Sequence, residues 1–193
     1  MDLTPKASKI VEVAHDLFWK FGIKRVSVKE ICERAQCSKM TFYRHFDNKT
    51  DLAKTVLKQI MLESRESYRG IMSQDVSFSE KIHEIVVLKS ESSKDISAEL
   101  IQDIISGDEP ELEAFLHSLR QELQKETLAD FKKAQQNGDI RKDLNIEFAL
   151  HFADKLSAMA LDKELQSHFD TTQELIVEVT NLFFYGIGTK ENS

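Results

Sequence analysis

The sequence predicts an all-α fold of about nine helices, and two kinds of observation support this. The 193 residues include only six Gly and two Pro, which are too few turn-forming residues for a many-stranded β architecture. Apolar residues recur at helical spacing in one segment after another. Hydrophobic residues make up 41% of the chain and charged residues 31%, a composition typical of globular proteins.

Four helices are expected near the N-terminus, at residues 8–21, 27–35, 38–46 and about 48–68. Most of their ends carry a suitable residue: Gly22 after the first, Ser27 with Glu30 as a capping box before the second, Ser38 before the third and Asn48 before the fourth. Only Gln36 and Cys37 separate the second helix from the third, which indicates a tight turn.

Five more helices are expected after a loop at residues 70–77. They cover residue 77 to a polar break at residues 90–94, and then residues 96–105, 110–138, 145–161 and 172–187. The residues that suit their first turns are Ser77 with Glu80 as a capping box, Pro110, Asn145, and either Thr171 or Thr172.

Charge divides the chain unevenly around its net value of −7. Residues 1–60 hold 12 Lys and Arg against 7 Asp and Glu, whereas residues 61–193 hold 14 against 26. A basic first third on an acidic body predicts that the N-terminal region binds a polyanion. We therefore expect two domains, residues 1–60 and residues 61–193.

Several classes of protein are excluded by missing signals. The N-terminus has no secretory signal, and no apolar run approaches the roughly 18 residues of a membrane helix, so we expect a cytoplasmic protein with no membrane partner. Cys32 and Cys37 do not have CxxC spacing and are expected to pack as small apolar residues. The sequence has no motif such as HExxH, GxSxG or a phosphate-binding glycine loop, so we expect no enzyme, catalytic residue, metal or cofactor.

Residues 28–47 have the pattern of a helix-turn-helix motif, whose second helix enters the major groove of DNA. Phe42 and Phe46 lie four residues apart and are expected to pack inward, which leaves Lys39 to Thr41 to face the bases. We expect phosphate contacts from Tyr43, His45 and Lys49, whereas Arg44 is either a DNA contact or a solvated surface charge. The full set of predicted DNA-binding residues is Ser27, Lys29, Ser38, Lys39, Met40, Thr41, Tyr43, Arg44, His45 and Lys49.

The sequence from Ile10 to Leu57 resembles the DNA-binding domain of TetR-family regulators. The matching positions are Ala14, Phe18, Gly22, Val26, Ser27, Val28, Ile31, Ala35, the run from Ser38 to Phe46, Lys49 and Leu52. Gln36 stands where the family usually has Gly, and we expect it to hold a left-handed backbone at some cost. Cys37 replaces a branched aliphatic residue. Neither departure removes a predicted DNA contact.

The resemblance implies a homodimer that binds double-stranded operator DNA and, through residues 61–193, a small apolar or amphipathic effector. Dimer contacts are expected from residues 145–161, which begin at Asn145 and end at Leu161, and from Thr172 to Ile187. Candidate effector contacts, each with plain core packing as the alternative, are Phe78, Ile82, Ile85, Phe115, Leu119, Phe131, Phe148 and Phe152.

The leading functional hypothesis is a TetR-like repressor that an effector releases from a palindromic operator. The alternative is a helix-turn-helix regulator that is controlled by a protein partner or acts without an effector. An all-α enzyme is a third class. It would require a polar cluster buried between helices, for which the sequence has no obvious candidate.

Overall fold

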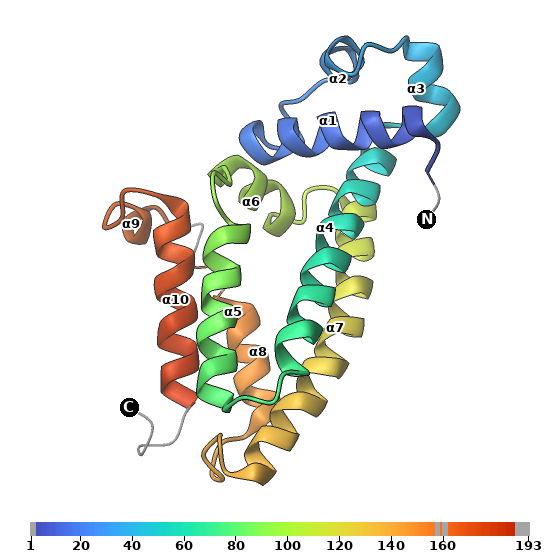
Figure 1. The fold of residues 1–193 in the computed structure, drawn as a ribbon. Helices are drawn as coiled ribbons and strands as arrows, with labels where there is room; N and C mark the ends of the chain where they lie inside the picture. The colour runs from blue at the N-terminus through green and yellow to red at the C-terminus, as the bar shows by residue number, and fades with distance from the viewer. Residues whose placement is uncertain (1–2, 157–158, 160–161, 188–193) are drawn as a thin grey trace. The chain divides into compact units, whose positions relative to one another are not determined.

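The structure, a computed structural model, describes residues 3–156, 159 and 162–187. In this part of the chain it has ten helices and no β-strand, which confirms the predicted all-α class (Figure 1). In chain order the helices are α1 (Pro5–Phe21), α2 (Val28–Arg34), α3 (Lys39–His45), α4 (Lys49–Met72), α5 (Phe78–Ser92), α6 (Ala98–Ile105), α7 (Pro110–Asn137), α8 (Ile146–Leu156), α9 (Lys163–Gln166) and α10 (Thr172–Ile187).

The predicted boundaries need four corrections. α1 begins three residues early because the Thr4 side chain accepts a hydrogen bond from the Ala7 N–H and Pro5 suits the first helical turn. α4 continues through Gly70 to Met72, where a loop was expected, and α5 reaches Ser92 within the expected break. The fourth correction is α9, whose four residues are too few to show a period. Part of the predicted helix at 145–161, namely residues 157, 158, 160 and 161, lies outside the described residues.

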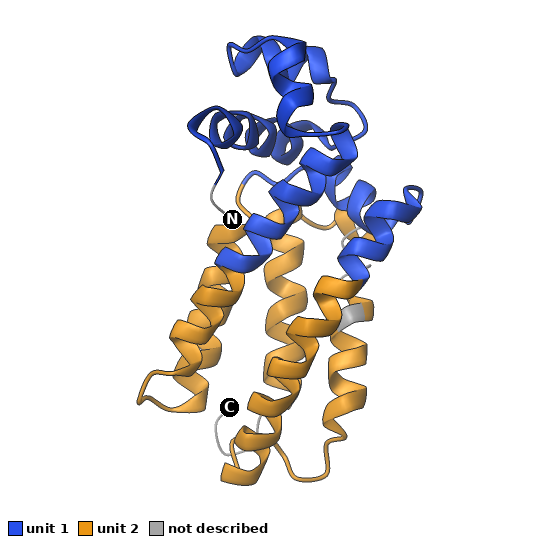
Figure 2. Cartoon of the chain, turned by 90° about the vertical axis from the view of Figure 1, so that its right-hand side faces the viewer, with its two compact units in different colours: residues 1–63, 95–117 blue, residues 64–94, 118–193 orange. Residues whose placement is uncertain are grey.

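Contacts between residues divide the chain into two compact units (Figure 2). Unit 1 comprises residues 1–63 and 95–117, and unit 2 comprises residues 64–94 and 118–193. The N-terminal helices therefore share their unit with α6 and the start of α7. The functional division at residue 60, which assigns DNA binding to one domain and effector binding to the other, stays a prediction.

Unit 1 has a single apolar core to which α6 and α7 contribute. Phe18, Phe42 and Leu52 are fully buried in it, together with Leu100 of α6. The Ser97 N–H donates to the Trp19 carbonyl oxygen at 3.0 Å, which ties the start of α6 to α1. α6 is therefore part of the same packed body as α1, α3 and the start of α4.

The end of α1 lies close to α6 at Gly22. Gly22 has a φ of 79°, and an added Cβ would lie 2.8 Å from Asp103 Oδ2 and 3.0 Å from Glu99 Cβ. Asp103, with only 8% of its side chain exposed, accepts a hydrogen bond from the Lys24 N–H at 3.0 Å. Glycine is required here both for the left-handed conformation and for the close approach of α6.

Unit 2 is built on helix-to-helix packing with an aromatic core. Phe131 is buried at its centre, and its ring meets that of Phe78 edge-on at 6.4 Å between centroids. α10 packs along α5, where Gln173 Nε2 donates to the Ser90 carbonyl oxygen at 2.7 Å (Figure 1). None of the described helices combines the length and apolar character needed to cross a membrane.

Candidate nucleic-acid interface

The turn between α2 and α3 is a complete Schellman motif. The Cys37 N–H donates to the Cys32 carbonyl oxygen at 2.9 Å, and the Gln36 N–H donates to that of Glu33 at 3.3 Å. Gln36 has a φ of 51°, so the predicted left-handed residue is confirmed. This motif ends α2 and reverses the direction of the chain, so that α3 starts two residues after Cys37.

α3 is held to unit 1 by two phenylalanines. Phe42 and Phe46 are both buried, with ring centroids 5.8 Å apart, as their four-residue spacing predicts. The Ser38 side chain caps the helix by accepting a hydrogen bond from the Thr41 N–H at 3.0 Å. The anchoring sets which face of this short helix is left to solvent.

The solvent-facing side of α3 carries four of the predicted DNA contacts. Lys39, Met40, Tyr43 and Arg44 are exposed, Met40 at 72% and Tyr43 at 54%. Their spacing places Met40, Tyr43 and Arg44 away from Phe42, and Lys39 lies at the start of the helix. A long apolar side chain so exposed on a short helix next to two cations is suited to contact with a nucleic acid.

The remaining predicted DNA contacts differ in their exposure to solvent and in the partners that they already have within the chain. Ser27 Oγ accepts a hydrogen bond from the Glu30 N–H at 3.1 Å and caps α2, which is one of the two bonds of the predicted capping box. The Glu30 carboxylate instead lies 3.5 Å from the Arg34 guanidinium. Lys29 is exposed and lies 3.7 Å from Glu33. Thr41 and His45 are half-buried, the latter beside the Phe46 ring.

Lys49, which is predicted to contact a phosphate, makes three hydrogen bonds within unit 1. Its ammonium donates to the carbonyl oxygens of Ile23, Lys24 and Val26, at 2.6, 3.0 and 2.8 Å. Burial lowers the pKa of this ammonium, although Glu109 and Asp103 oppose the effect. All three donors of the ammonium are used in this conformation, so it has none left for a phosphate. The side chain instead fastens the loop between α1 and α2 to the start of α4.

Sequence reasoning missed a group of acidic residues in unit 1 that meet the loop after α1 and the start of α4. Lys24 Nζ lies 2.5 Å from Asp108 Oδ2, Thr50 Oγ1 donates to Glu109 at 3.3 Å, and Lys54 pairs with Glu111. These acids follow α6 and lie about 50 to 80 residues along the chain from their partners. The negative charge of that segment was visible in the sequence, but its target was not.

The residues predicted to contact an effector are divided between the two units. Phe78, Ile82 and Phe131 lie in the interior of unit 2, with Ile85 and Leu119 half-buried in the same unit, whereas Phe115 packs against the core of unit 1. Phe148 and Phe152 are exposed on α8, with their rings stacked at 6.1 Å.

The placement of Phe148 and Phe152 corrects the expectation that they face an interior pocket. Ile146 and Ala149 form the buried side of α8, so the two rings lie on its other side. Hollows of about 800 Å³ between α1 and α4 in unit 1, and of about 480 Å³ between α7 and α8 in unit 2, have none of the eight predicted residues in their linings.

Comparison with known proteins agrees with this geometry. Residues 10–56, which hold most of α1, all of α2 and α3, and the start of α4, match the family model described as "Bacterial regulatory proteins, tetR family". The transcriptional repressor KstR2 of Rhodococcus jostii is 20% identical over 153 residues, which cover 76% of this chain and 74% of that protein. Residues 10–56 of this chain are therefore similar to TetR-family regulators.

Further likenesses extend beyond residues 10–56. The transcriptional regulator UidR of Escherichia coli K12 is 25% identical over 147 residues, or 73% of this chain and 72% of UidR. The fatty acid degradation regulator FadR from Bacillus halodurans has the same fold, with a TM-score of 0.78 and 16% identity over 96% of this chain and 98% of FadR. The curated proteins that this chain resembles are named as helix-turn-helix transcriptional regulators.

Proposed function

We propose that this chain is a homodimeric TetR-family repressor that binds a near-palindromic operator through α3 and is released by a small effector. The observation that carries the DNA-binding half is the exposed face of α3, where Lys39, Met40, Tyr43 and Arg44 project from a helix anchored by buried phenylalanines. A dimer would place two such helices in successive major grooves about 34 Å apart.

The residues of α3 divide into two roles in this proposal. Lys39, Met40 and Thr41 are at the N-terminal end of the helix, which meets base edges in helix-turn-helix proteins. Tyr43 and His45 donate hydrogen bonds to phosphates, and Arg44 contributes a further charge. Ser27 and Ser38 act first as helix caps, and their positions at helix N-termini are compatible with an adjacent phosphate. Lys49 positions the loop after α1.

An operator selected from a random pool of DNA duplexes tests the two roles. Lys39→Ala and Thr41→Ala should change the base preference, because each removes groups that meet base edges, with a loss of about 1–3 kcal/mol on the wild-type operator. Tyr43→Phe should weaken binding to all sequences similarly. Lys6→Ala, in an exposed position of α1, is the control for general loss of charge. Unchanged binding in all three α3 variants would show that another element reads DNA.

The proposed homodimer is supported by apolar side chains on α8 and α10. Phe148, Phe152, Leu182 and Tyr185 are all exposed, although each is a large apolar or aromatic residue. Both helices come from the segments in which the sequence predicts dimer contacts, and they belong to unit 2. An exposed apolar surface of this kind marks an association site, and a second copy would cover it symmetrically.

Release by an effector is supported by the position of α6. This helix packs with α1 through the Ser97 to Trp19 hydrogen bond and the Asp103 to Lys24 contact. In the chain it lies between α5 and α7, and α5 and most of α7 belong to unit 2. An effector that binds unit 2 more tightly in one conformation would shift α6 and change the spacing of the two α3 helices.

The effector is sought among apolar and amphipathic acids, since relatives include regulators named for fatty acid degradation and ketosteroids. Medium- and long-chain fatty acids and their thioesters, with cholate as a steroid acid, would be screened for thermal stabilisation and for release of the selected operator. Stabilisation together with release supports the proposal. Operator binding that no compound alters, but that a co-purified protein abolishes, favours control by a protein partner.

A further inference from the structure

Two thiols meet at the turn of the helix-turn-helix motif. Cys32 lies in the last turn of α2, and Cys37 directly precedes Ser38, the N-cap of α3. The Cys37 N–H donates to the Cys32 carbonyl oxygen at 2.9 Å, which is the wider hydrogen bond of the Schellman motif. Apolar side chains at these two positions commonly contact each other, and here both are thiols.

The two thiols differ in their access to solvent. Both are free, and Cys32 is buried in the unit 1 core whereas Cys37 is half-buried against the same core. Burial of Cys32 and the Cys37 thiol beside it raise the pKa of Cys32, so this thiol stays protonated at neutral pH. A small oxidant therefore meets Cys37 first, with Cys32 as the adjacent partner.

We propose that Cys32 and Cys37 form an oxidation site, at which hydrogen peroxide converts the pair to an intrachain disulfide that weakens DNA binding by α3. The Cys37 thiolate attacks one peroxide oxygen, the O–O bond breaks, hydroxide leaves, and Cys37 becomes a sulfenic acid. The Cys32 sulfur then attacks the Cys37 sulfur. The S–S bond forms, the S–O bond breaks, and the departing hydroxide takes the Cys32 proton to become water. Two thiols lose two electrons, and one peroxide is reduced to two waters.

The disulfide displaces the start of α3 because the unit 1 core restrains Cys32 more strongly than Cys37. A disulfide draws the sulfurs to about 2.05 Å, well inside the contact distance of two thiols. Cys32 is held in the core beside the fully buried Ile31, so most of the movement falls on Cys37 and on Ser38, which caps α3. Lys39 and Met40 follow directly. The effect on DNA rests on the proposed function of α3, whereas formation of the disulfide does not.

The experiment treats the reduced full chain with hydrogen peroxide and measures the covalent product and the DNA affinity. Trypsin cuts after Lys29, Arg34 and Lys39, so a disulfide links the peptides covering residues 30–34 and 35–39. We expect this linked pair, lighter by two hydrogen atoms than the two thiol peptides. We also expect about a tenfold or greater loss of affinity for the selected operator, reversed by dithiothreitol. Reversal separates the effect from oxidation of the exposed Met40, because dithiothreitol does not readily reduce a sulfoxide.

Cys37→Ser is the matched variant, and Cys37→Ala replaces it if circular dichroism shows that the serine variant is not folded. Either variant should bind DNA with an affinity that peroxide no longer changes in a reversible way. The proposal is overturned if peroxide yields only sulfinic acid or a crosslink between chains, if the disulfide forms and affinity is unchanged, or if the variant keeps the reversible loss. A reduced chain that binds neither the operator nor a random duplex contradicts the proposed function, while the peptide map still tests the thiol pair.

Discussion

Gln36 holds a left-handed backbone conformation, with a φ of 51°, at the turn that aims α3. A residue with a Cβ pays about 1–2 kcal/mol for this conformation, and glycine loses about 0.5–1 kcal/mol through its freedom in the unfolded chain. We therefore expect Gln36→Gly to raise the free energy of unfolding by about 0.5–1 kcal/mol. Urea denaturation measures this, with Gln36→Ala as the control that keeps the Cβ and should show no gain. Equal gains in both variants would mean that the Gln36 side chain, rather than the backbone, is the source of strain.

Lys49 is the second residue whose neighbours decide its role. Its ammonium donates to three carbonyl oxygens of the loop between α1 and α2, all within 3.0 Å. Lys49→Met keeps the alkyl chain but leaves these carbonyls without a charged donor, and we expect a loss of about 2 kcal/mol in the free energy of unfolding. Urea denaturation of Lys49→Met beside Lys6→Met measures the loss. If Lys49→Met leaves the stability unchanged but weakens DNA binding, the result would favour the phosphate contact that the sequence predicts for Lys49.

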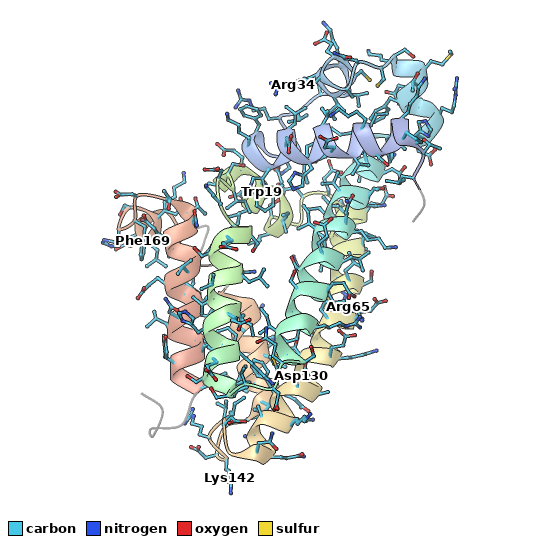
Figure 3. All side chains as sticks on the ribbon, in the orientation of Figure 1. Trp19, Arg34, Arg65, Asp130, Lys142 and Phe169 are labelled. Carbon is cyan, nitrogen blue, oxygen red and sulfur yellow. The ribbon has the colours of Figure 1, made fainter. Side chains whose placement is uncertain are left out.

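At the scale of the elements, α4 and α7 are joined in unit 2 by a group of charges. Glu126 of α7 accepts from Arg65 Nε at 2.9 Å and from Arg69 NH2 at 2.5 Å, both on α4 (Figure 3 shows Arg65 on α4). These hydrogen bonds from Arg65 and Arg69 lower the pKa of Glu126 to about 2 from the usual 4.5. A carboxylate of lowered pKa stabilises the fold above its unfolded pKa, and that contribution disappears as the pH falls through its folded pKa.

Acid unfolding should therefore depend on Glu126 in a defined pH range. Wild type should unfold at a higher urea concentration than Glu126→Gln above pH 4.5, and the difference should shrink as the pH falls toward about 2. Asp75→Asn, in the exposed loop after α4, is the control for the loss of one carboxylate. A difference between wild type and Glu126→Gln that stays constant down to the lowest pH would show that the ion pair is not its source.

At the scale of the whole molecule, the exposed aromatic and apolar side chains of α8 and α10 determine the expected assembly. Phe152→Glu places a charge among Phe148, Leu182 and Tyr185, all of which are exposed in the single chain. If a second copy covers them, the variant should weaken dimerisation by about 2 kcal/mol or more, which is roughly 30-fold in the dissociation constant. Analytical ultracentrifugation across a concentration series measures the change.

Val76→Glu is the control for the dimer prediction, because Val76 is an exposed apolar residue in the loop before α5. It should sediment as the wild type does. The Phe152→Glu variant should also lose affinity for a two-half-site operator while it binds a single half-site as before, since each α3 is unchanged. Wild-type sedimentation of Phe152→Glu would mean that another surface joins the two copies.

The sequence by itself determined the parts of the fold that depend on the order of neighbouring residues in the chain. Helical spacing of apolar residues identified nine helices and placed Phe42 and Phe46 on the inner side of α3, which left the DNA-facing residues on the other. The match of Gln36 to a glycine position indicated the left-handed turn. These features arise within a few residues of the chain, where spacing, caps and backbone preference act directly.

Only the tertiary structure decided which partner each of these surfaces meets. In the structure the Lys49 ammonium donates hydrogen bonds to carbonyl oxygens more than 20 residues away along the chain. α6 and Phe115 pack in unit 1 with α1 and α3, and Phe148 and Phe152 are exposed. Periodicity shows that a side of a helix is apolar, but the element that covers it is set by packing between distant segments. The same packing against the unit 1 core buries the Cys32 thiol beside Cys37 at the turn before α3.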